Sequence, residues 1–352
     1  MVRLGMIGAG NIANLHISSY KKNPNVEIVA ICDINPDRLN ETADKFGIKN
    51  RYSSVKEMLA NEKLDAADVC VWNCAHAECT IAALEAGLDV LCEKPMAMSY
   101  DEAKAMKETA ERCGKLLMLG FVTRFSPEAK IAKDLIDDGF FGDIYYSKAS
   151  YIRRNGNPGG WFSDKAKSGG GAVIDIGVHP LDLTRYLMGN PKPVSVYAVV
   201  NDYLRNERKA LKTRVAWYPK GADPERDIDN VDTSGVAIIK YDNGATTLLE
   251  AAYAINGEPH SERSIYGTKG GITLDGMKVF SEMNGFMTDV KLVDLGSYKD
   301  GGDLFDNEMN HFIDCVMGKC ECKSPAEDGV VVMKILDAIY ESARTGHEVI
   351  LD

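Results

Sequence analysis

The stretch VRLGMIGAGNIANLHISSYKKNPNVEIVAICD, residues 2 to 33, carries the strongest structural signal in this chain. Its two short apolar runs, 2–7 and 26–32, are typical of buried parallel strands, and a helical pattern lies between them. The turn after the first run reads Gly8-Ala9-Gly10-Asn11-Ile12-Ala13, which fits G-x-G-x-x-G/A at the start of a helix. The second run ends on Asp33, twenty residues after Ala13. The segment therefore predicts a strand–turn–helix–strand unit that binds a dinucleotide.

Each position of this turn has its own role in the predicted site. Gly8 permits the tight turn, and Gly10 leaves room for a pyrophosphate against the backbone. Ala13 lets the helix pack closely on the strand, while the helix amino terminus, at Asn11 and Ile12, presents amides to the phosphates. Because Gly-rich turns are common, the prediction depends on the strands, the helix and the terminal acid occurring together.

Asp33 indicates which dinucleotide the site accepts. An acid at this place accepts hydrogen bonds from both hydroxyls of the adenosine ribose and repels a 2′-phosphate. The next residues, Ile34-Asn35-Pro36, supply no cation, and Arg38 lies a turn into the following helix. We therefore expect the cofactor to be NAD, with Arg38 as the nearest cation, and NADP to be less favoured.

Composition limits the function classes. The chain has 352 residues, which predicts two domains, and its 45% hydrophobic and 26% charged residues are typical of a soluble globular protein. A net charge of −11 and a pI near 5.2 argue against a nucleic-acid or anionic-membrane partner. Because the sequence has neither a signal-peptide pattern nor an apolar run approaching eighteen residues, we expect a cytoplasmic protein.

The first half of the chain alternates strand-like and helical patterns. Apolar runs at 67–71, 89–92 and 116–119 alternate with helical patterns at 77–86 and 101–113. Each helical pattern is closed by a glycine, Gly87 or Gly114, that is typical of a helix C-cap. This alternation predicts a parallel sheet with helices on both faces, which together with the Gly-rich turn indicates a Rossmann domain over residues 1–122.

The rhythm changes after about Val122. A helix is expected at 127–138, then a long strand at 143–154 and a helix at 172–188. Short strands follow at 194–203, 232–241, 245–253, 262–267 and 270–274, and two helices, 305–317 and 325–345, end the chain. The fold class is therefore α/β, with a second domain over 123–352 built on an open, mainly antiparallel sheet. We expect this domain to bind substrate and to cover its sheet with another subunit, as a homodimer or homotetramer, and we expect 204–230 to form an extended loop.

The nine cysteines indicate reduced thiols in a cytosolic protein. Cys315, Cys320 and Cys322 follow His311 closely enough to raise the question of a metal site. The sequence contains no C-x-x-C pair, however, and Cys315 falls on the apolar face of a predicted helix. We therefore expect no metal.

Two further clusters carry candidate chemistry. Lys94 lies in Glu93-Lys94-Pro95 at the carboxyl end of a predicted parallel strand, where open α/β sheets bind ligands, although a solvated strand end is an equal alternative. Asp175 and His179 are four residues apart after three glycines, and a carboxylate beside an imidazole makes a better base. The alternative for His179 is a packed core histidine.

With these pieces the chain resembles the glucose–fructose oxidoreductase/inositol dehydrogenase (Gfo/Idh/MocA) family over nearly its whole length. The matching residues are Gly8, Gly10, Ala13, Asp33, Asn73-x-x-His76, Glu93-Lys94-Pro95 and Gly169-Gly170-Gly171 with Asp175 and His179. The resemblance implies a catalytic set of Lys94, Asp175 and His179, and adds Asn73, His76, Glu93 and Lys94 to the cofactor site. One departure is visible, since Val71-Trp72 stands where family members often have Thr-Pro.

The resemblance also indicates a substrate site and a reaction. The loop 151–162 is similar to the substrate loop of members that act on sugars or glycosides, and the implied substrate residues are Arg124, Arg153, Arg154, Trp161 and His179. We expect an NAD-dependent oxidoreductase of a sugar, glycoside or cyclic polyol, in which His179 or Lys94 is the base. A redox-assisted glycosidase and a non-catalytic dinucleotide or sugar sensor are the alternatives. The sequence does not identify the substrate, the oxidised position or the physiological direction.

Overall fold

The computed structural model describes residues 1–209, 228–293, 295 and 302–351, and the chain divides into two compact units. The first unit comprises Met1–Ser126 and Gly301–Val330, and the second comprises Pro127–Asp300 and Val331–Asp352. The break after Ser126 lies four residues beyond the expected boundary at 122. A larger difference is that residues 301–330, expected in the second domain, pack with the first unit.

The first unit contains a parallel sheet of six strands in the order β3-β2-β1-β4-β5-β6. Their pairing is parallel throughout, and the strands are β1 Val2–Ile7, β2 Val26–Cys32, β3 Asn50–Tyr52, β4 Ala66–Val69, β5 Asp89–Glu93 and β6 Leu117–Gly120. Strand order reverses between β1 and β4, so the carboxyl ends of these strands flank the switch point at which such sheets bind ligands. The predicted Rossmann fold is confirmed.

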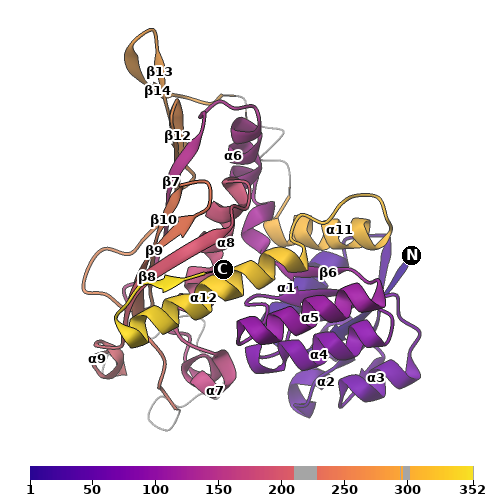
Figure 1. The fold of residues 1–352 in the computed structure, drawn as a ribbon. Helices are drawn as coiled ribbons and strands as arrows, with labels where there is room; N and C mark the ends of the chain where they lie inside the picture. Colours follow the sequence, from indigo (N-terminus) through magenta and orange to yellow (C-terminus); the bar gives the residue numbers. More distant parts are fainter. Residues whose placement is uncertain (210–227, 294, 296–301, 352) are drawn as a thin grey trace. The chain divides into compact units, whose positions relative to one another are not determined.

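Helices cover this sheet and are closed by the residues that the sequence indicates. The helices of the first unit are α1 Asn11–Tyr20, α2 Pro36–Phe46, α3 Val55–Asn61, α4 Asn73–Glu85, α5 Tyr100–Cys113, α11 Leu304–Val316 and a 3-10 turn at Val122–Phe125. Gly114 ends α5 in the left-handed conformation, and Gly87 follows α4 with φ of +85°. Within the unit, α4 packs beside α5, and α1 packs against α11 (Figure 1).

The second unit contains a nine-stranded sheet in the order β14-β13-β12-β11-β7-β10-β9-β8-β15. Only the β7–β10 pair is parallel among the pairs described, so the expected mainly antiparallel sheet is confirmed. The strands are β7 Ile144–Ile152, β8 Pro193–Asn201, β9 Ser234–Tyr241, β10 Thr246–Ala252, β11 His260–Gly267, β12 Gly270–Thr273, β13 Lys278–Met283, β14 Phe286–Val290 and β15 Val349–Ile350. Figure 1 shows the β13–β14 hairpin at the far end of this sheet.

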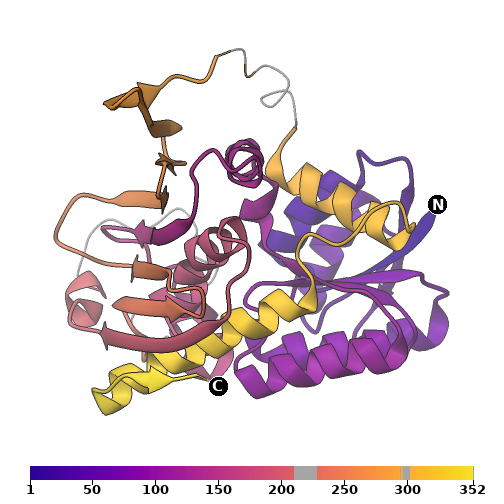
Figure 2. The same cartoon turned by 45° about the horizontal axis from the view of Figure 1, so that its top comes forward.

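Helix α8 Val178–Leu187 covers one face of the second sheet. The other helices described in this unit are α6 Pro127–Asp137, α7 Lys165–Ser168, α9 Arg205–Lys209 and α12 Ala326–Thr345, which begins in the first unit. The helix α8 packs on β7, β10 and β11, and the Ser342 hydroxyl of α12 accepts the Ala198 amide of β8 at 2.9 Å (Figures 1 and 2). The other face keeps large apolar side chains exposed, among them Val236 and Ile238 of β9.

Three differences from the expected elements bear on function. The helix expected over 172–188 begins as a π-helical turn, Val173–Gly177, before it continues as α8. Residues 205–209 of the expected loop form α9, and residues 210–227 lie outside the described part of the chain. Within the described residues, no helix is both long and apolar enough to span a membrane.

Candidate active site

The Gly-rich turn joins β1 to α1 and brings the carboxyl ends of β1, β2 and β4 close together. Gly8 has φ of +101°, a conformation that residues with a side chain rarely adopt. A Cβ atom there would also overlap the carbonyl oxygen of Cys70, which follows β4. The Gly8 amide donates a hydrogen bond to the Cys32 carbonyl oxygen at 2.8 Å. Both conformation and the close approach of β4 therefore require glycine here.

Gly10 leaves space beside the amino terminus of α1. It is the N-cap of this helix, and within the described residues no heavy atom lies within 4 Å of the place a Cβ would take. Asn11 is exposed and Ile12 half-buried, whereas Ala13 is fully buried in the core. Space, helix amides and the positive end of the helix dipole together fit a pyrophosphate.

Asp33 follows β2 and is held by two backbone amides. Its Oδ2 accepts the Ala9 amide at 2.8 Å and its Oδ1 accepts the Asn35 amide at 2.7 Å. These bonds fix the half-buried carboxylate beside the Gly-rich turn, where an acid can bind ribose hydroxyls. Arg38 lies in the first turn of α2 with an exposed side chain, and its own amide is capped by Asn35 Oδ1 at 3.0 Å.

Both ring nitrogens of His76 lie close to backbone carbonyl oxygens. Nδ1 lies 2.7 Å from the Pro95 carbonyl oxygen and Nε2 lies 3.1 Å from that of Val71. Burial lowers the pKa of this imidazole, so it is neutral and donates from one nitrogen only. His76 thus supports the turn after β5, and its contact with the cofactor stays a prediction. Asn73, three residues earlier, is the buried first residue of α4.

A chain of buried charged groups leads to Lys94. The Lys94 amide donates to Glu93 Oε2 at 2.9 Å, and Glu93 Oε1 lies 3.1 Å from His16 Nε2. On the other side of this imidazole, His16 Nδ1 lies 2.8 Å from Asp68 Oδ2, and Asp68 Oδ1 accepts the Cys70 thiol at 3.2 Å. The chain crosses from β4 through α1 to the end of β5.

His16 is the positively charged member of this row of buried groups. Burial lowers its pKa, but Asp68 and Cys70 outweigh burial and hold the pKa well above the usual value of 6.5. A protonated, fully buried imidazole therefore lies between the carboxylates of Asp68 and Glu93. Sequence reasoning missed both His16 and Asp68. A signal existed in Asp68, a charged residue inside a four-residue strand that is otherwise apolar.

Lys94 lies directly after β5, at the carboxyl edge of the Rossmann sheet. Its side chain is half-buried, and the Lys94–Pro95 peptide bond is cis. Glu93 contributes to the placement of Lys94 through its bond to the Lys94 amide, and its contact with the cofactor stays a prediction.

Asp175 belongs to the π-helical turn and bonds to a tyrosine that sequence reasoning missed. The Tyr253 hydroxyl, buried just after β10, donates to Asp175 Oδ2 at 2.7 Å. Burial and the nearby carboxylate raise the pKa of Tyr253, which keeps the phenol a donor. His179 is half-buried in the first turn of α8. Asp175 thus lies in the π-helical turn and His179 in the α-helical turn that follows, so the predicted i, i+4 pair spans the junction between the two.

Two of the three glycines before this turn, Gly170 and Gly171, lie directly against other parts of the chain. A Cβ at Gly170 would overlap the Tyr340 hydroxyl, and one at Gly171 would overlap the backbone of Asp232. Asp232 caps the turn, because its carboxylate accepts the amides of Gly171 at 2.7 Å and Val173 at 3.0 Å. The Tyr340 hydroxyl donates to the same carboxylate at 2.8 Å. Gly170 and Gly171 therefore leave the space that this helix cap needs.

Arg124, which the resemblance places in the substrate site, makes internal contacts in the structure, and its contact with substrate stays a prediction. The side chain is fully buried, and Nη1 lies 2.6 Å from the Lys323 carbonyl oxygen and 2.8 Å from Asp328 Oδ2. The guanidinium also lies 5.1 Å from the centroid of the Phe121 ring. Arg124 thus ties the end of β6 to the start of α12. Only the folded chain reveals this, because the partners are about 200 residues away.

Side chains of the predicted substrate loop, 151–162, contact one another. Arg153 Nη2 donates to the Tyr151 hydroxyl at 2.9 Å and its Nη1 to the Gly156 carbonyl oxygen at 3.1 Å, so this arginine folds the loop. Arg154 is exposed. The half-buried Trp161 stacks on Phe162 with ring centroids 3.9 Å apart. Contacts of Arg153, Arg154 and Trp161 with substrate stay a prediction.

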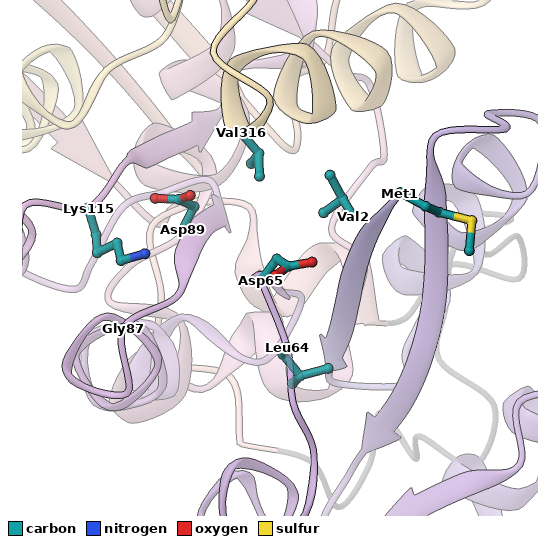
Figure 3. A pocket seen from close by; sticks show the side chains of 8 residues that line it. All are labelled: Met1, Val2, Leu64, Asp65, Gly87, Asp89, Lys115 and Val316. Carbon is teal, nitrogen blue, oxygen red and sulfur yellow. The ribbon is translucent and has the colours of Figure 1, made fainter.

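A surface pocket of about 310 Å³ lies at the opposite edge of the Rossmann sheet from the Gly-rich turn. Its lining residues, drawn in Figure 3, include Val2 at the start of β1, Asp65 before β4, Asp89 at the start of β5 and Lys115 before β6. Since cofactors bind at the carboxyl ends of parallel strands, this pocket is not the predicted dinucleotide site.

Both halves of the chain match family models. Residues 2–121 match a model described as an oxidoreductase family with an NAD-binding Rossmann fold. Residues 130–273 match a model described as the GFO/IDH/MocA C-terminal domain. The two matches cover most of both units.

Named relatives and solved structures extend this likeness over the full length. A D-glucoside 3-dehydrogenase of Escherichia coli strain K12 is 33% identical over 352 residues, which cover 99% of this chain and 97% of the relative. A levoglucosan dehydrogenase of Pseudarthrobacter phenanthrenivorans is 29% identical over 78% of this chain and 73% of its own. A solved levoglucosan dehydrogenase in complex with NADH is 26% identical, has a TM-score of 0.84, and covers 100% of this chain and 99% of its own.

Proposed function

The chain belongs to the Gfo/Idh/MocA family of oxidoreductases, and from this premise we propose that it is a dehydrogenase that oxidises a hydroxyl group of a sugar, glycoside or cyclic polyol. The family resemblance read from the motifs is confirmed, and the amino-terminal unit is an NAD-binding Rossmann domain. The observation that carries the proposal is the fixed Asp33 carboxylate beside an open helix amino terminus, with Lys94 at the same sheet edge.

The cofactor residues fit NAD. Gly10 and the amides at Asn11 and Ile12 hold the pyrophosphate, and Asp33 binds the adenosine ribose. When bound, NAD⁺ supplies the hydride acceptor at nicotinamide C4. Glu93, through the Lys94 amide, fixes the backbone from which the lysine side chain extends.

The chain's own side chains perform the proton transfer. Lys94, Asp175 and His179 form the proposed catalytic set, in which His179 takes the hydroxyl proton and Lys94 stabilises the developing oxyanion. Tyr253 donates to Asp175 Oδ2, which orients that side chain. The remaining acceptor positions of Asp175 support the protonated imidazole of His179. Arg154 and Trp161 contact the sugar.

The catalytic set is tested by single substitutions. We expect Lys94→Ala and His179→Ala each to lower kcat by about 10²–10⁴-fold while NAD binding changes little. Asp175→Ala should lower kcat by a smaller factor. The effects of Asp175→Ala and His179→Ala on kcat should be far from additive in the double variant, because both residues act on one proton. The measurements are steady-state kinetics on an authentic substrate and NAD titration by fluorescence. Near wild-type turnover in both single variants contradicts the mechanism.

The reaction class is tested by measuring NADH formation over a panel of D-glucosides, anhydrosugars, aldoses and inositols. Steady NADH production with one class supports the dehydrogenase. Substrate turnover with tightly held NAD and no net NADH instead identifies a redox-assisted glycosidase. Ligand binding without turnover identifies a sensor. Each outcome separates the proposal from the other two functions, because only a dehydrogenase releases reduced cofactor.

We also propose that the protein is cytoplasmic and forms a homodimer or homotetramer through the second sheet. All nine cysteines are free thiols, which supports a reducing compartment. The sheet face away from α8 carries exposed Tyr197, Val199, Val236 and Ile238, each 45–56% exposed, which supports burial against another copy.

A further inference from the structure

One cluster of metal-binding side chains lies in the first unit away from the Gly-rich turn. Cys315 is in the last turn of α11, His311 lies one turn earlier, and Cys320 lies in the segment that follows the helix. One ring nitrogen and the two sulfur atoms all lie within 4.8 Å of one another. We propose that His311, Cys315 and Cys320 bind a zinc ion that holds this segment to α11.

The spacing of the three groups fits tetrahedral zinc. The two sulfur atoms are 3.6 Å apart, His311 Nε2 is 3.4 Å from Cys315 Sγ, and His311 Nδ1 is 3.6 Å from Cys320 Sγ. Zinc bonds of about 2.3 Å to sulfur and 2.0 Å to nitrogen at a tetrahedral angle place two sulfurs about 3.8 Å apart and sulfur and nitrogen about 3.5 Å apart. The sulfur–sulfur distance and the distance from Cys315 Sγ to Nε2 match these values. Because one zinc ion binds one ring nitrogen, the imidazole or the Cys320 side chain must turn so that both sulfur atoms face the same nitrogen; one such nitrogen and both sulfurs already lie within 4.8 Å of one another.

A fourth thiol favours the same ligand chemistry. The Cys322 thiol hydrogen-bonds to that of Cys315, so a further soft donor lies beside the set. The Lys323 amide donates to His311 Nε2 at 3.0 Å, and this bond is exchanged when zinc takes that nitrogen. Each thiol releases its proton on binding.

A zinc ion here would stabilise contacts on which the first unit depends. The segment after α11 supplies the Lys323 carbonyl oxygen to Arg124 and the Ser324 hydroxyl to the Leu119 carbonyl oxygen, at 2.6 and 2.7 Å. His311 also packs on Phe125, with ring centroids 5.2 Å apart. The ion would thus connect α11 to the end of β6 through one short segment. This is a structural role, independent of the dehydrogenase proposal. The expectation of no metal rested on the absence of a C-x-x-C pair. In the proposed site, two ligands, His311 and Cys315, are instead one helical turn apart on α11, and Cys320 comes from the segment after the helix.

The test is zinc retention by the full-length protein under reducing conditions. After incubation with Zn²⁺ and gel filtration, we expect about one equivalent to remain, and Co²⁺ to give a thiolate charge-transfer band. Cys315→Ser and Cys320→Ser should lose both signals, whereas Cys113→Ser, a thiol at the end of α5, should keep them. Absence of retained metal in the wild type, or unchanged retention in both variants, overturns the proposal.

A second measurement needs no variant. In the wild type, Zn²⁺ should slow alkylation of Cys320, which is exposed, at least about tenfold, and a chelator should restore its rate. Cys74, also exposed, should react equally with and without zinc. Equal alkylation of Cys320 in both conditions overturns the proposal. A Cys315–Cys320 disulfide that forms without reductant, together with no zinc binding when reductant is present, overturns the proposal in favour of a redox pair.

Discussion

At the scale of single residues, Asp33 decides between the two nicotinamide cofactors. Its carboxylate is held by the amides of Ala9 and Asn35, so it cannot turn away from a 2′-phosphate. Repulsion of about 1.4 kcal/mol between this carboxylate and the 2′-phosphate of NADP corresponds to a tenfold preference for NAD over NADP. We expect wild-type enzyme to have the higher kcat/KM with NAD, and Asp33→Ala to raise the NADP-to-NAD ratio of kcat/KM about tenfold or more.

The control for this prediction is Asp37→Ala, which removes an exposed acid from the first turn of α2 and should leave the ratio unchanged. Thermal melting of both variants checks that loss of the Ala9 bond has not unfolded the domain. A wild-type enzyme that prefers NADP would show that Asp33 does not face the ribose.

Single residues also mark the limit of motif reading. Gly8, Ala13 and Asp33 act through neighbours that the motif itself specifies, so their places in the structure agree with the sequence. Arg124 and His76 act through Asp328 and Pro95, whose proximity depends on the packing of the whole unit. A cation or imidazole near a strand end therefore predicts a ligand contact only where the fold brings no internal partner to it.

At the scale of elements, His16 connects α1 to β4 and β5. Its pKa in the folded state is raised, while the unfolded value is about 6.5. The native state thus holds the proton more tightly, so this stabilisation is complete below pH 6.5 and is lost as pH rises through the folded pKa. We expect the wild-type free energy of unfolding, measured by urea denaturation, to fall between pH 7 and 8, above most of the range in which the lowered pKa values of His76 and His311 act in the opposite direction.

His16→Gln should remove this slope and lower stability by about 3–5 kcal/mol, because two buried carboxylates lose their cation. The exposed His260, changed to Gln, is the matched control and should preserve the slope. The pH range of the measurement ends at 8 because buried thiols add a second effect above it. Burial raises the pKa of Cys32 to about 12 and that of Cys322 to about 11, so these thiols also lower stability once their unfolded forms begin to ionise. If the free energy of unfolding of His16→Gln falls with pH as it does in the wild type, a group other than His16 causes the fall.

The elements themselves were predicted where periodicity is strong. The helix α5 begins one residue before its expected start and ends at Cys113 as expected, because Ser99 and Gly114 cap it. The π turn at 173–177 was not predictable from the 3.6-residue pattern, since it depends on Asp232 accepting two amides of the turn. The hairpin β13–β14 carries exposed Phe286 and Met287, so it lacks the buried alternation that identifies a strand.

At the scale of the whole molecule, the exposed face of the second sheet leads to a prediction about the assembly. Tyr197 lies opposite Ile238 and Val199 opposite Val236 in the β8–β9 register, and all four side chains are exposed. Apolar cross-strand pairs on a sheet face of this kind are typical of a surface buried by a partner. Because the same patch on a second copy is self-complementary, we expect a two-fold interface. Light scattering at micromolar concentration should give the mass of a dimer or tetramer.

Val236→Lys combined with Ile238→Lys should shift this mass toward the monomer, because each added charge would be buried at the interface without a partner. The matched control is Leu15→Lys, which places the same charge on an exposed apolar position of α1 in the first unit and should leave the mass unchanged. A wild-type monomer would contradict the assembly. An unchanged mass in the β9 variant would place the interface elsewhere, since two lysines on adjacent outward positions of one strand cannot both remain solvated inside a packed sheet face.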